Sequence, residues 1–375
     1  MKQTSICISP IDWGLGHATR CITLIRALES LGFKIFIASE GKHEIILREA
    51  IPNATFLSLR GYRIRYTKNR ALLIPAIIFQ LPKIIRAIIN EYFWLKREAK
   101  IHDFDLIISD NRFGFFHKKI KSVFITHQLE LQTPFAWSTR LNQIITYGFL
   151  NKYTACWVAD MQPPNNLSGV LANPGKPPIT PIWYMNCLSR LLHKTSDEKN
   201  ELINANTHNE INKENKIKFL GIVSGPEPQR TLLENILWQQ GNDLDIPFVI
   251  AAGLPDDKLY NKITSRGYLY HHLNGSDLKT QINKAEYIIC RGGYTTLMEL
   301  IPFKKKLIFI PTPGQTEQEY LGRYWQDKKW AISFTQSEFN LKMALQLASE
   351  FTYQDPPFIA FSNDALVNEL KRLSL

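Results

Sequence analysis

Short runs of almost uninterrupted apolar residues alternate with amphipathic segments along both halves of the chain, and this alternation constrains its fold most. The first run, residues 4–9 (TSICIS), leads into a loop with two glycines. Apolar residues at helical spacing then predict a helix over Ala18–Leu31, ended by Gly32. The next apolar run, Phe33–Ala38, predicts a second strand. Strand, glycine loop, helix and strand form a βαβ unit, which requires a parallel sheet.

The same pattern continues through the first half of the chain and restarts in the second. Strands that are apolar throughout indicate a sheet covered by helices on both faces, hence an α/β fold. A polar stretch at residues 194–217 separates the two halves. We therefore predict two Rossmann-like domains that face each other across a cleft. The N-terminal domain is placed at residues 1–185, a polar linker at 186–216, and the C-terminal domain at 217–375, whose last helix can pack back on the first domain. The further predicted strands are Leu106–Ser109, Val123–Thr126, Ala155–Ala159, Lys218–Val223, Pro247–Ala252, Tyr287–Cys290 and Leu307–Ile310.

Composition excludes several classes of protein. The 375 residues are 45% apolar and 21% charged, as in ordinary globular chains, which excludes disordered and fibrous proteins. The five cysteines are scattered without a Cys-x-x-Cys pair, so we predict neither a disulfide framework nor a metal site. No apolar run reaches the length of a spanning helix, and residues 1–5 lead into a strand without a signal-type apolar segment. We therefore expect a cytoplasmic protein.

Positive charge is concentrated in the first half of the chain. Residues 1–187 carry 23 Lys and Arg against 12 Asp and Glu, whereas residues 188–375 carry 22 of each kind. Ten basic and two acidic residues lie within Arg60–Lys100, where Ile84–Lys96 is predicted to form an amphipathic helix. This segment is either a solvated basic face over a core helix or a surface that binds anionic lipid and gives access to a lipid-linked acceptor. Nucleic-acid binding is disfavoured, because no nucleic-acid-binding module accompanies the charge.

Four loops that follow predicted strands hold the candidate functional residues. The first loop, Asp12–Arg20, contains Gly14 and Gly16, which allow a ligand to approach the backbone closely. His17 stands at the start of the following helix, where a neutral imidazole can accept a proton from a substrate hydroxyl. The alternative is a capping or packing role for His17. Thr19 replaces the third glycine of the dinucleotide fingerprint, which argues against a NAD site.

The second and third loops lie in the second half of the chain. Ser224 and Gly225, in the loop after a strand, can hold an oxyanion, with a rigid proline-rich turn as the alternative. The third loop is Arg-Gly-Gly at residues 291–293, whose glycines, backbone N–H groups and arginine suit a diphosphate. Glu299, in the helix that follows, can accept two ribose hydroxyls. The alternative for Glu299 is an ordinary solvated carboxylate.

The fourth loop, Pro311–Glu319, opens another helix and carries the pattern Pro-x-x-Gly-Gln-x-Glu-Gln. Together with Arg-Gly-Gly…Glu, this pattern resembles the donor-nucleotide site of GT-B glycosyltransferases. The likeness is greatest to family 28, which includes the N-acetylglucosaminyltransferase of lipid II synthesis and the galactolipid synthases. Gly-x-Gly-His-Ala-Thr-Arg in the first loop also resembles this family. The likeness covers both predicted domains, although residues 60–215 match only in outline.

The resemblance implies an inverting transferase that moves a hexose or an N-acetylhexosamine from a UDP-sugar to an acceptor hydroxyl, on a lipid or a cell-envelope glycan. It implies no metal or other cofactor, an N-terminal domain that binds the acceptor, and a C-terminal domain that binds the nucleotide sugar. His17 would act as the base or orient the acceptor. Glu319 stands where glutamine is common in the lipid II enzyme, which bears on the choice of sugar. The implied donor contacts are Ser224, Gly225, Arg291, Gly292, Gly293, Tyr294, Thr295, Glu299, Gln318 and Glu319.

Two other functions stay open from the sequence. One is a UDP-sugar epimerase or hydrolase of the same fold, although the Gly-Thr-Arg-Pro-Glu start of such epimerases is missing. The other is a non-catalytic nucleotide-binding protein docked on membranes, against which the presence of His17, Arg291 and Glu299 argues. Product analysis without an acceptor separates the first alternative from a transferase. The residues predicted to line the acceptor side are Gly14, Gly16, Asp110, Arg112 and His127.

Overall fold

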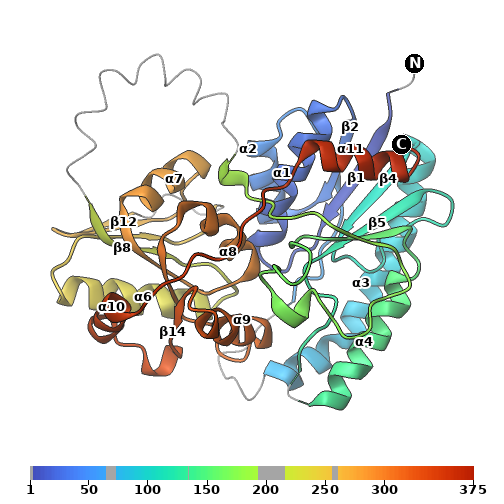
Figure 1. Ribbon diagram of the computed structural model, residues 1–375. Helices are drawn as coiled ribbons and strands as arrows, with labels where there is room; N and C mark the ends of the chain where they lie inside the picture. Colours follow the sequence, from blue (N-terminus) through green and yellow to red (C-terminus); the bar gives the residue numbers. More distant parts are fainter. Residues whose placement is uncertain (1–2, 65–72, 134, 193–215, 256–260) are drawn as a thin grey trace. The chain divides into compact units, whose positions relative to one another are not determined.

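The chain forms two compact units, each with its own sheet (Figure 1). The first unit comprises Met1–Leu188 and Pro357–Leu375, and the second comprises Ser189–Pro356. None of the helices in the described part of the chain is both long enough and apolar enough to cross a bilayer. The computed structural model describes residues 3–64, 73–133, 135–192, 216–255 and 261–375.

The first unit contains a seven-stranded parallel sheet of order β3-β2-β1-β4-β5-β6-β7. Its central strands are buried along their whole length, because helices cover both faces of the sheet. Each strand of this unit that the sequence predicts is present. The short edge strands were not predicted, since they are polar or only partly buried. In chain order the strands are β1 (Ser5–Pro10), β2 (Lys34–Ser39), β3 (Thr55–Ser58), β4 (Leu106–Asp110), β5 (Lys121–Thr126), β6 (Ala155–Val158) and β7 (Ile182–Tyr184).

The helices of the first unit divide between the two faces of its sheet. From β1 through β2 to β3, successive strands are added toward the β3 edge of the sheet. The connections from β3 to β4 and from β5 to β6 run in the opposite direction, toward the β7 edge. Because parallel crossovers are right-handed, α1 and α2 cover one face, and α3 and α4 cover the other. The predicted helix over Ile84–Lys96 is the middle of the longer α3. The bounds are α1 (Leu15–Ser30), α2 (Gly41–Ala50), α3 (Leu73–His102), α4 (Ala136–Leu150), the 3₁₀ turn η2 (Gly169–Leu171) and α11 (Asn363–Arg372).

The segment between β4 and β5 packs against both α3 and α4. The Phe116 ring lies 5.2 Å from that of Tyr92 on α3, and the Phe113 ring lies 5.2 Å from that of Phe149 on α4. A Cβ atom on Gly114 would lie 2.0 Å from the carbonyl oxygen of Ile88, so α3 packs directly on this backbone. Only glycine fits at that contact.

The last helix, α11, belongs to the first unit although it follows the second in the chain. The indole nitrogen of Trp157, on β6, donates a hydrogen bond of 2.9 Å to Glu369 on α11. Cys187 and Ala360 also form a backbone bridge. Most of the predicted linker, residues 193–215, lies outside the described residues.

The second unit contains a sheet of order β10-β11-β9-β8-β12-β13-β14, parallel except for β10. From β11 onward this is the strand order of a Rossmann fold. Its core includes Phe219, Leu237, Ile250 and Ile289. The predicted strands of the second half are all present. The bounds are β8 (Ile217–Ile222), β9 (Phe248–Ala251), β10 (Lys262–Ile263), β11 (Gly267–Tyr270), β12 (Ala285–Cys290), β13 (Lys306–Phe309) and β14 (Ile332–Ser333).

Helices and 3₁₀ turns (η) connect these strands. In chain order they are η3 (Arg190–Leu192), α6 (Gln229–Asp243), α7 (Gly275–Lys284), α8 (Tyr294–Leu300), η4 (Ile301–Phe303), α9 (Thr316–Asp327), η5 (Gln336–Glu338) and α10 (Leu341–Glu350).

Candidate active site

In the first unit, the loops after β1 and β4 meet at the carboxyl edge of the sheet. These strands are neighbours at the point where the strand order reverses, which is where ligands of open α/β sheets bind. His17 lies in the first turn of α1, and Asp110 is the last residue of β4. The Nδ1 atom of His17 is 2.9 Å from the Oδ1 atom of Asp110. Two residues that the sequence placed on separate loops thus form a hydrogen-bonded pair.

The buried carboxylate of Asp110 favours one of the two neutral forms of His17. Burial alone would raise the pKa of Asp110, but Arg20 and His17 hold it below its usual range, so the group stays ionised. Nδ1 of His17 faces two groups: the carboxylate, which only accepts a hydrogen bond, and Nη2 of Arg20 at 3.0 Å, which only donates one. We assign the proton to Nδ1, toward the shorter contact with the charged carboxylate, which leaves a lone pair on Nε2. Burial, assisted by the charge of Arg20 and opposed by that of Asp110, lowers the pKa of His17 to about 4. His17 is therefore neutral at physiological pH.

Arg20 was not among the predicted site residues, yet it holds this pair together. Its Nε atom donates to Asp110 Oδ2 at 2.8 Å, and its Nη2 atom donates to Oδ1. Its Nη1 atom lies 2.8 Å from Nδ1 of His127, another predicted residue. The guanidinium and the carboxylate are both buried. The spacing of His17 and Arg20, three residues apart on one helix, was the available signal, because such residues share a helix face.

The remaining predicted residues of the first unit have different environments. Gly14 precedes α1 with φ of 110°, a conformation that favours glycine, and Gly16 lies inside the first turn. Arg112 is buried, and its guanidinium is directed into the protein. It donates to Glu91 of α3 at 2.6 Å and to the carbonyl oxygen of Arg60 at 2.9 Å. Arg112 thus ties α3 and the loop at Arg60 to the sheet.

In the second unit, the loops after β8, β12 and β13 lie together at the carboxyl edge, because these three strands are neighbours. They carry Ser224 and Gly225, then Gly292 and Gly293, and then the segment Pro311–Glu319. Gln318 Oε1 accepts a hydrogen bond of 2.8 Å from the backbone N–H of Thr312, and Glu319 Oε1 accepts one of 2.9 Å from Gly314. Tyr294 is buried and Thr295 partly buried in the first turn of α8.

The side chain of Arg291 is buried beneath these loops. It donates to the carbonyl oxygens of Gln229 and Ile310 and, at 2.5 Å, to Oε1 of Gln336. Burial lowers the pKa of Arg291 to about 10, so the group still carries its positive charge at neutral pH. The guanidinium is thus directed into the protein, and its direct contact with a diphosphate stays a prediction.

Glu299 is paired with an arginine that the sequence motifs did not reveal. The Nε atom of Arg190, in η3, lies 2.8 Å from Oε1 of Glu299, and both side chains are largely buried. The two residues are 109 positions apart, and no local spacing pattern connects such a pair. Glu299 is thus an ion-paired carboxylate and not a solvated one.

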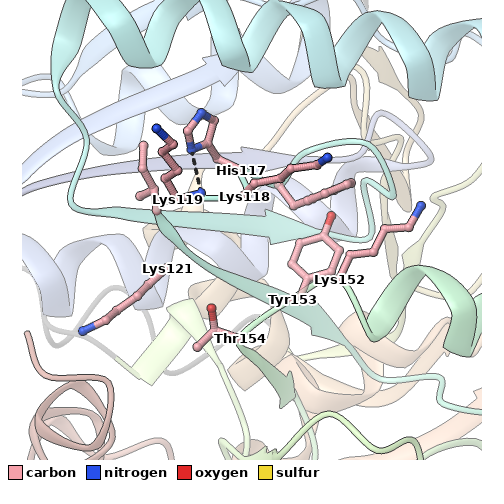
Figure 2. Close-up of a pocket in the computed structure, with 9 residues that line it drawn as sticks. His117, Lys118, Lys119, Lys121, Lys152, Tyr153 and Thr154 are labelled. Atoms are coloured by element: carbon pink, nitrogen blue, oxygen red, sulfur yellow. Dashed lines mark hydrogen bonds between the residues drawn. The ribbon is translucent and has the colours of Figure 1, made fainter.

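A pocket lies at the opposite, amino edge of the first sheet (Figure 2). Its position follows from Lys121, which begins β5, and Thr154, which precedes β6. The side chain of Lys121 donates to the carbonyl oxygens of Leu373 and Ser374, just after α11. No acidic side chain lines this pocket, and none of the predicted site residues does. The lining residues are Phe116, His117, Lys118, Lys119, Ile120, Lys121, Lys152, Tyr153 and Thr154.

Comparisons with known proteins identify similar chains. Residues 231–354 match the model of the glycosyltransferase family 28 C-terminal domain. A curated relative from Clostridium perfringens, UDP-N-acetylglucosamine–N-acetylmuramyl-(pentapeptide) pyrophosphoryl-undecaprenol N-acetylglucosamine transferase, is 25% identical over 354 residues, which are 88% of this chain and 85% of the relative.

Solved glycosyltransferases share the fold of both units. SnogD from Streptomyces nogalater has a TM-score of 0.60 at 14% identity, with all of both chains covered. MurG from Acinetobacter baumannii has a TM-score of 0.53 at 12% identity, with 99% of this chain and 100% of the other covered. The glycosyltransferase of kitacinnamycin has a TM-score of 0.62 at 12% identity, with 100% and 95% covered. The predicted fold and enzyme class are confirmed: the chain is a glycosyltransferase with the GT-B fold, and its C-terminal part resembles family 28.

Proposed function

We propose that this glycosyltransferase moves a hexose or an N-acetylhexosamine from a UDP-sugar to the hydroxyl group of a lipid-linked acceptor, with inversion at the anomeric carbon. We place the reaction at the cytoplasmic face of a membrane and expect no cofactor. The name of the C. perfringens relative, a UDP-N-acetylglucosamine transferase that acts on a pyrophosphoryl-undecaprenol intermediate, supports both substrate classes.

The observation that carries the proposal is the hydrogen bond between His17 and Asp110. With the proton assigned to Nδ1, which then donates to this carboxylate, Nε2 can accept another proton. About 15% of the His17 side chain is exposed, which leaves it accessible at the carboxyl edge of the sheet. A buried, ionised carboxylate also stabilises the imidazolium that forms after proton transfer.

In the proposed step, the acceptor oxygen forms a bond to the anomeric carbon while the bond from that carbon to the phosphate oxygen breaks. UDP leaves with the electron pair of the broken bond. His17 Nε2 takes the proton of the acceptor hydroxyl. A single displacement of this kind inverts the configuration of the anomeric carbon.

Replacing His17 with alanine tests the proposal. A general base typically contributes about 10²- to 10⁴-fold to a rate, so kcat should fall by that factor in His17→Ala. Affinity for UDP should be retained, because the candidate donor residues are in the other unit. The rate is measured as UDP release from UDP-hexoses and UDP-N-acetylhexosamines with a prenyl-diphosphate-linked sugar as acceptor, and affinity is measured by calorimetry.

His117→Ala is the matched control, because His117 lies at the opposite edge of the same sheet. It should leave both kcat and UDP affinity unchanged. Full turnover by His17→Ala would remove His17 as the base, whereas sugar epimer formed in quantity without acceptor would favour an epimerase.

We further propose that α3 and α4 dock on an anionic membrane. Each helix exposes apolar side chains at four-residue spacing, whereas the outer face of a surface helix is normally polar. Phe79 is 88% exposed and Trp137 is 69% exposed. The exposed apolar residues are Ile78, Phe79, Leu81, Ile85, Ile89 and Phe93 on α3, and Trp137, Leu141, Ile144 and Ile145 on α4.

The positive charge around α3 and α4 indicates that the surface they bind is anionic. The sequence has no acidic residue from Arg60 to Asn90 or from Leu131 to Ala159. The lysine-lined pocket adds further positive charge beyond the C-terminal end of α4 (Figure 2). Apolar side chains bordered by Lys and Arg bind the surface of bilayers that contain anionic lipid.

Co-sedimentation with vesicles tests the docking. Phe79→Ser with Trp137→Ser should lower binding to phosphatidylglycerol-containing vesicles about tenfold or more, because two large apolar side chains no longer insert. Ile263→Ser is the matched control, since Ile263 is 68% exposed but lies in the second unit. Equal binding by both variants would contradict the docking. Vesicles of phosphatidylcholine alone should bind the unaltered protein more weakly.

A further inference from the structure

Thr312 carries a buried hydroxyl group that has no partner. The residue is 2% exposed, and its Oγ1 atom forms no hydrogen bond to any of the described residues. Its backbone is fully used, since its N–H donates to Gln318 and its carbonyl oxygen accepts from the N–H of Gln315 at 3.0 Å. A buried polar group left unpaired costs about 1–3 kcal/mol, so such groups usually pair with a water, an ion or a ligand.

The surroundings of this hydroxyl consist of two glycines and an amide. A Cβ atom on Gly225 would find Thr312 Oγ1 at 4.0 Å and no other atom within that distance. A Cβ atom on Gly293 would find only Gln318 Nε2, at 3.8 Å. Because Gln318 Oε1 accepts from Thr312 N–H, its amide nitrogen is the donor that faces Gly293. The hydroxyl of Thr312 and the amide of Gln318 are thus two hydrogen-bond donors that border the space beside Gly225 and Gly293, where neither glycine has a side chain.

The charge beneath these loops favours an anion. Arg291 is buried and positively charged, and among the described residues its hydrogen-bond acceptors are two carbonyl oxygens and an amide oxygen, none of them a carboxylate. Its Nε atom has no partner in the same set. A buried cation without a carboxylate partner lowers the energy of a negative group bound nearby.

We propose that Thr312 is a donor-binding residue whose hydroxyl donates a hydrogen bond to a diphosphate oxygen of the nucleotide, beside the amide of Gln318. The proposal rests on the proposed function, which supplies the nucleotide diphosphate. Thr312 has no counterpart among the residues implied by the family resemblance. Thr312 brings a neutral donor to the phosphate, while the charge of Arg291 acts from below without contact.

Valine replaces threonine with nearly the same shape and without the hydroxyl, so Thr312→Val tests the proposal. UDP affinity, measured by calorimetry, should fall about tenfold or more, since a hydrogen bond to a charged group is lost. Affinity for uridine, which has no phosphate, should be unchanged. The melting temperature without ligand should stay the same or rise, because an unpaired buried hydroxyl is removed. Thr312→Ser keeps the hydroxyl and should bind UDP within about threefold of the unaltered protein.

Thr23→Val is the matched control, because Thr23 in the first unit also has a buried hydroxyl without a partner among the described residues. It should leave UDP affinity unchanged. Equal UDP affinity of Thr312→Val and the unaltered protein would overturn the inference, as would equal losses for UDP and uridine. If the unaltered protein binds GDP or dTDP in place of UDP, the proposed donor is wrong, and the same comparison is made with that nucleotide and its nucleoside. If it binds no nucleoside diphosphate, both proposals fail together.

Discussion

The guanidinium of Arg20 contacts the carboxylate of Asp110 through two nitrogens and the imidazole of His127 through the third. Arg20 affects the proposed base, His17, in two opposite ways. Arg20 keeps Asp110 ionised, which orients His17, and it also places a positive charge 3.0 Å from His17 Nδ1, which disfavours the imidazolium. The result is a base that stays unprotonated well below neutral pH.

Arg20→Gln should therefore change the pH profile of the reaction. With Arg20 present, the pKa of His17 is about 4, so kcat/KM should fall only as the pH approaches that value. Loss of the cation raises this pKa, and the acid limb should move to higher pH. Each unit of movement lowers the rate on the acid side about tenfold. Arg20→Lys keeps a cation, so its acid limb should lie at a lower pH than that of Arg20→Gln. Steady-state rates between pH 4.5 and 8 provide the measurement.

Arg26→Gln, on the same helix, is the control and should leave the profile unchanged. A uniform loss of activity at every pH in Arg20→Gln would show that Arg20 only stabilises the fold. Titration of the His17 imidazole by NMR gives the same answer without turnover.

Motifs predicted the loops of the candidate site better than the directions of its side chains. Arg-Gly-Gly was predicted to follow a strand, and it does. A motif does not show on which side of the chain each residue lies, and Arg291 is directed inward. The contacts of Glu299 with Arg190 and of Asp110 with Arg20 also join distant parts of the chain, so the motifs revealed neither contact.

At the scale of elements, α3 shows why an amphipathic pattern alone does not place a helix. Its apolar residues repeat at helical spacing, but one stripe of them is exposed while Leu95 is buried against the sheet. What fixes its position is a buried ion pair. Glu91 accepts from Arg112 at 2.6 Å, from Tyr62 at 3.0 Å and from the backbone N–H of Gly114 at 3.1 Å.

Removing one partner of this pair should destabilise the first unit strongly. Arg112→Met leaves the charge of Glu91 buried without its partner, which typically costs about 3–5 kcal/mol. The free energy of unfolding is measured by urea denaturation. Arg97→Met, which removes a side chain that is 66% exposed from its pair with Glu98 on the same helix, should cost less than about 1 kcal/mol. Similar losses in the two variants would show that the buried pair does not anchor α3.

At the scale of the whole molecule, the fold class was predictable because two apolar βαβ patterns with a polar stretch between them leave few alternatives. Strands that are buried on both faces give a strong signal, and all of those predicted are present. The order of strands in each sheet had to come from the structure, because short edge strands such as β3 and β14 carry too few apolar residues to be recognised. The assignment of Pro357–Leu375 to the first unit rests on long-range contacts such as that of Glu369 with Trp157.

That assignment has a consequence for how the protein is made. Domains usually fold in the order in which they leave the ribosome. Synthesis proceeds at about 5–20 residues per second. Here the first sheet is complete when β7 has emerged, but Trp157 lacks its acceptor until Glu369 has been synthesised. At those speeds the delay is roughly 10 to 40 s, most of it taken by synthesis of the second unit, whose last residue, Pro356, is also made before Glu369. The unit that begins synthesis first is therefore the one that is finished last.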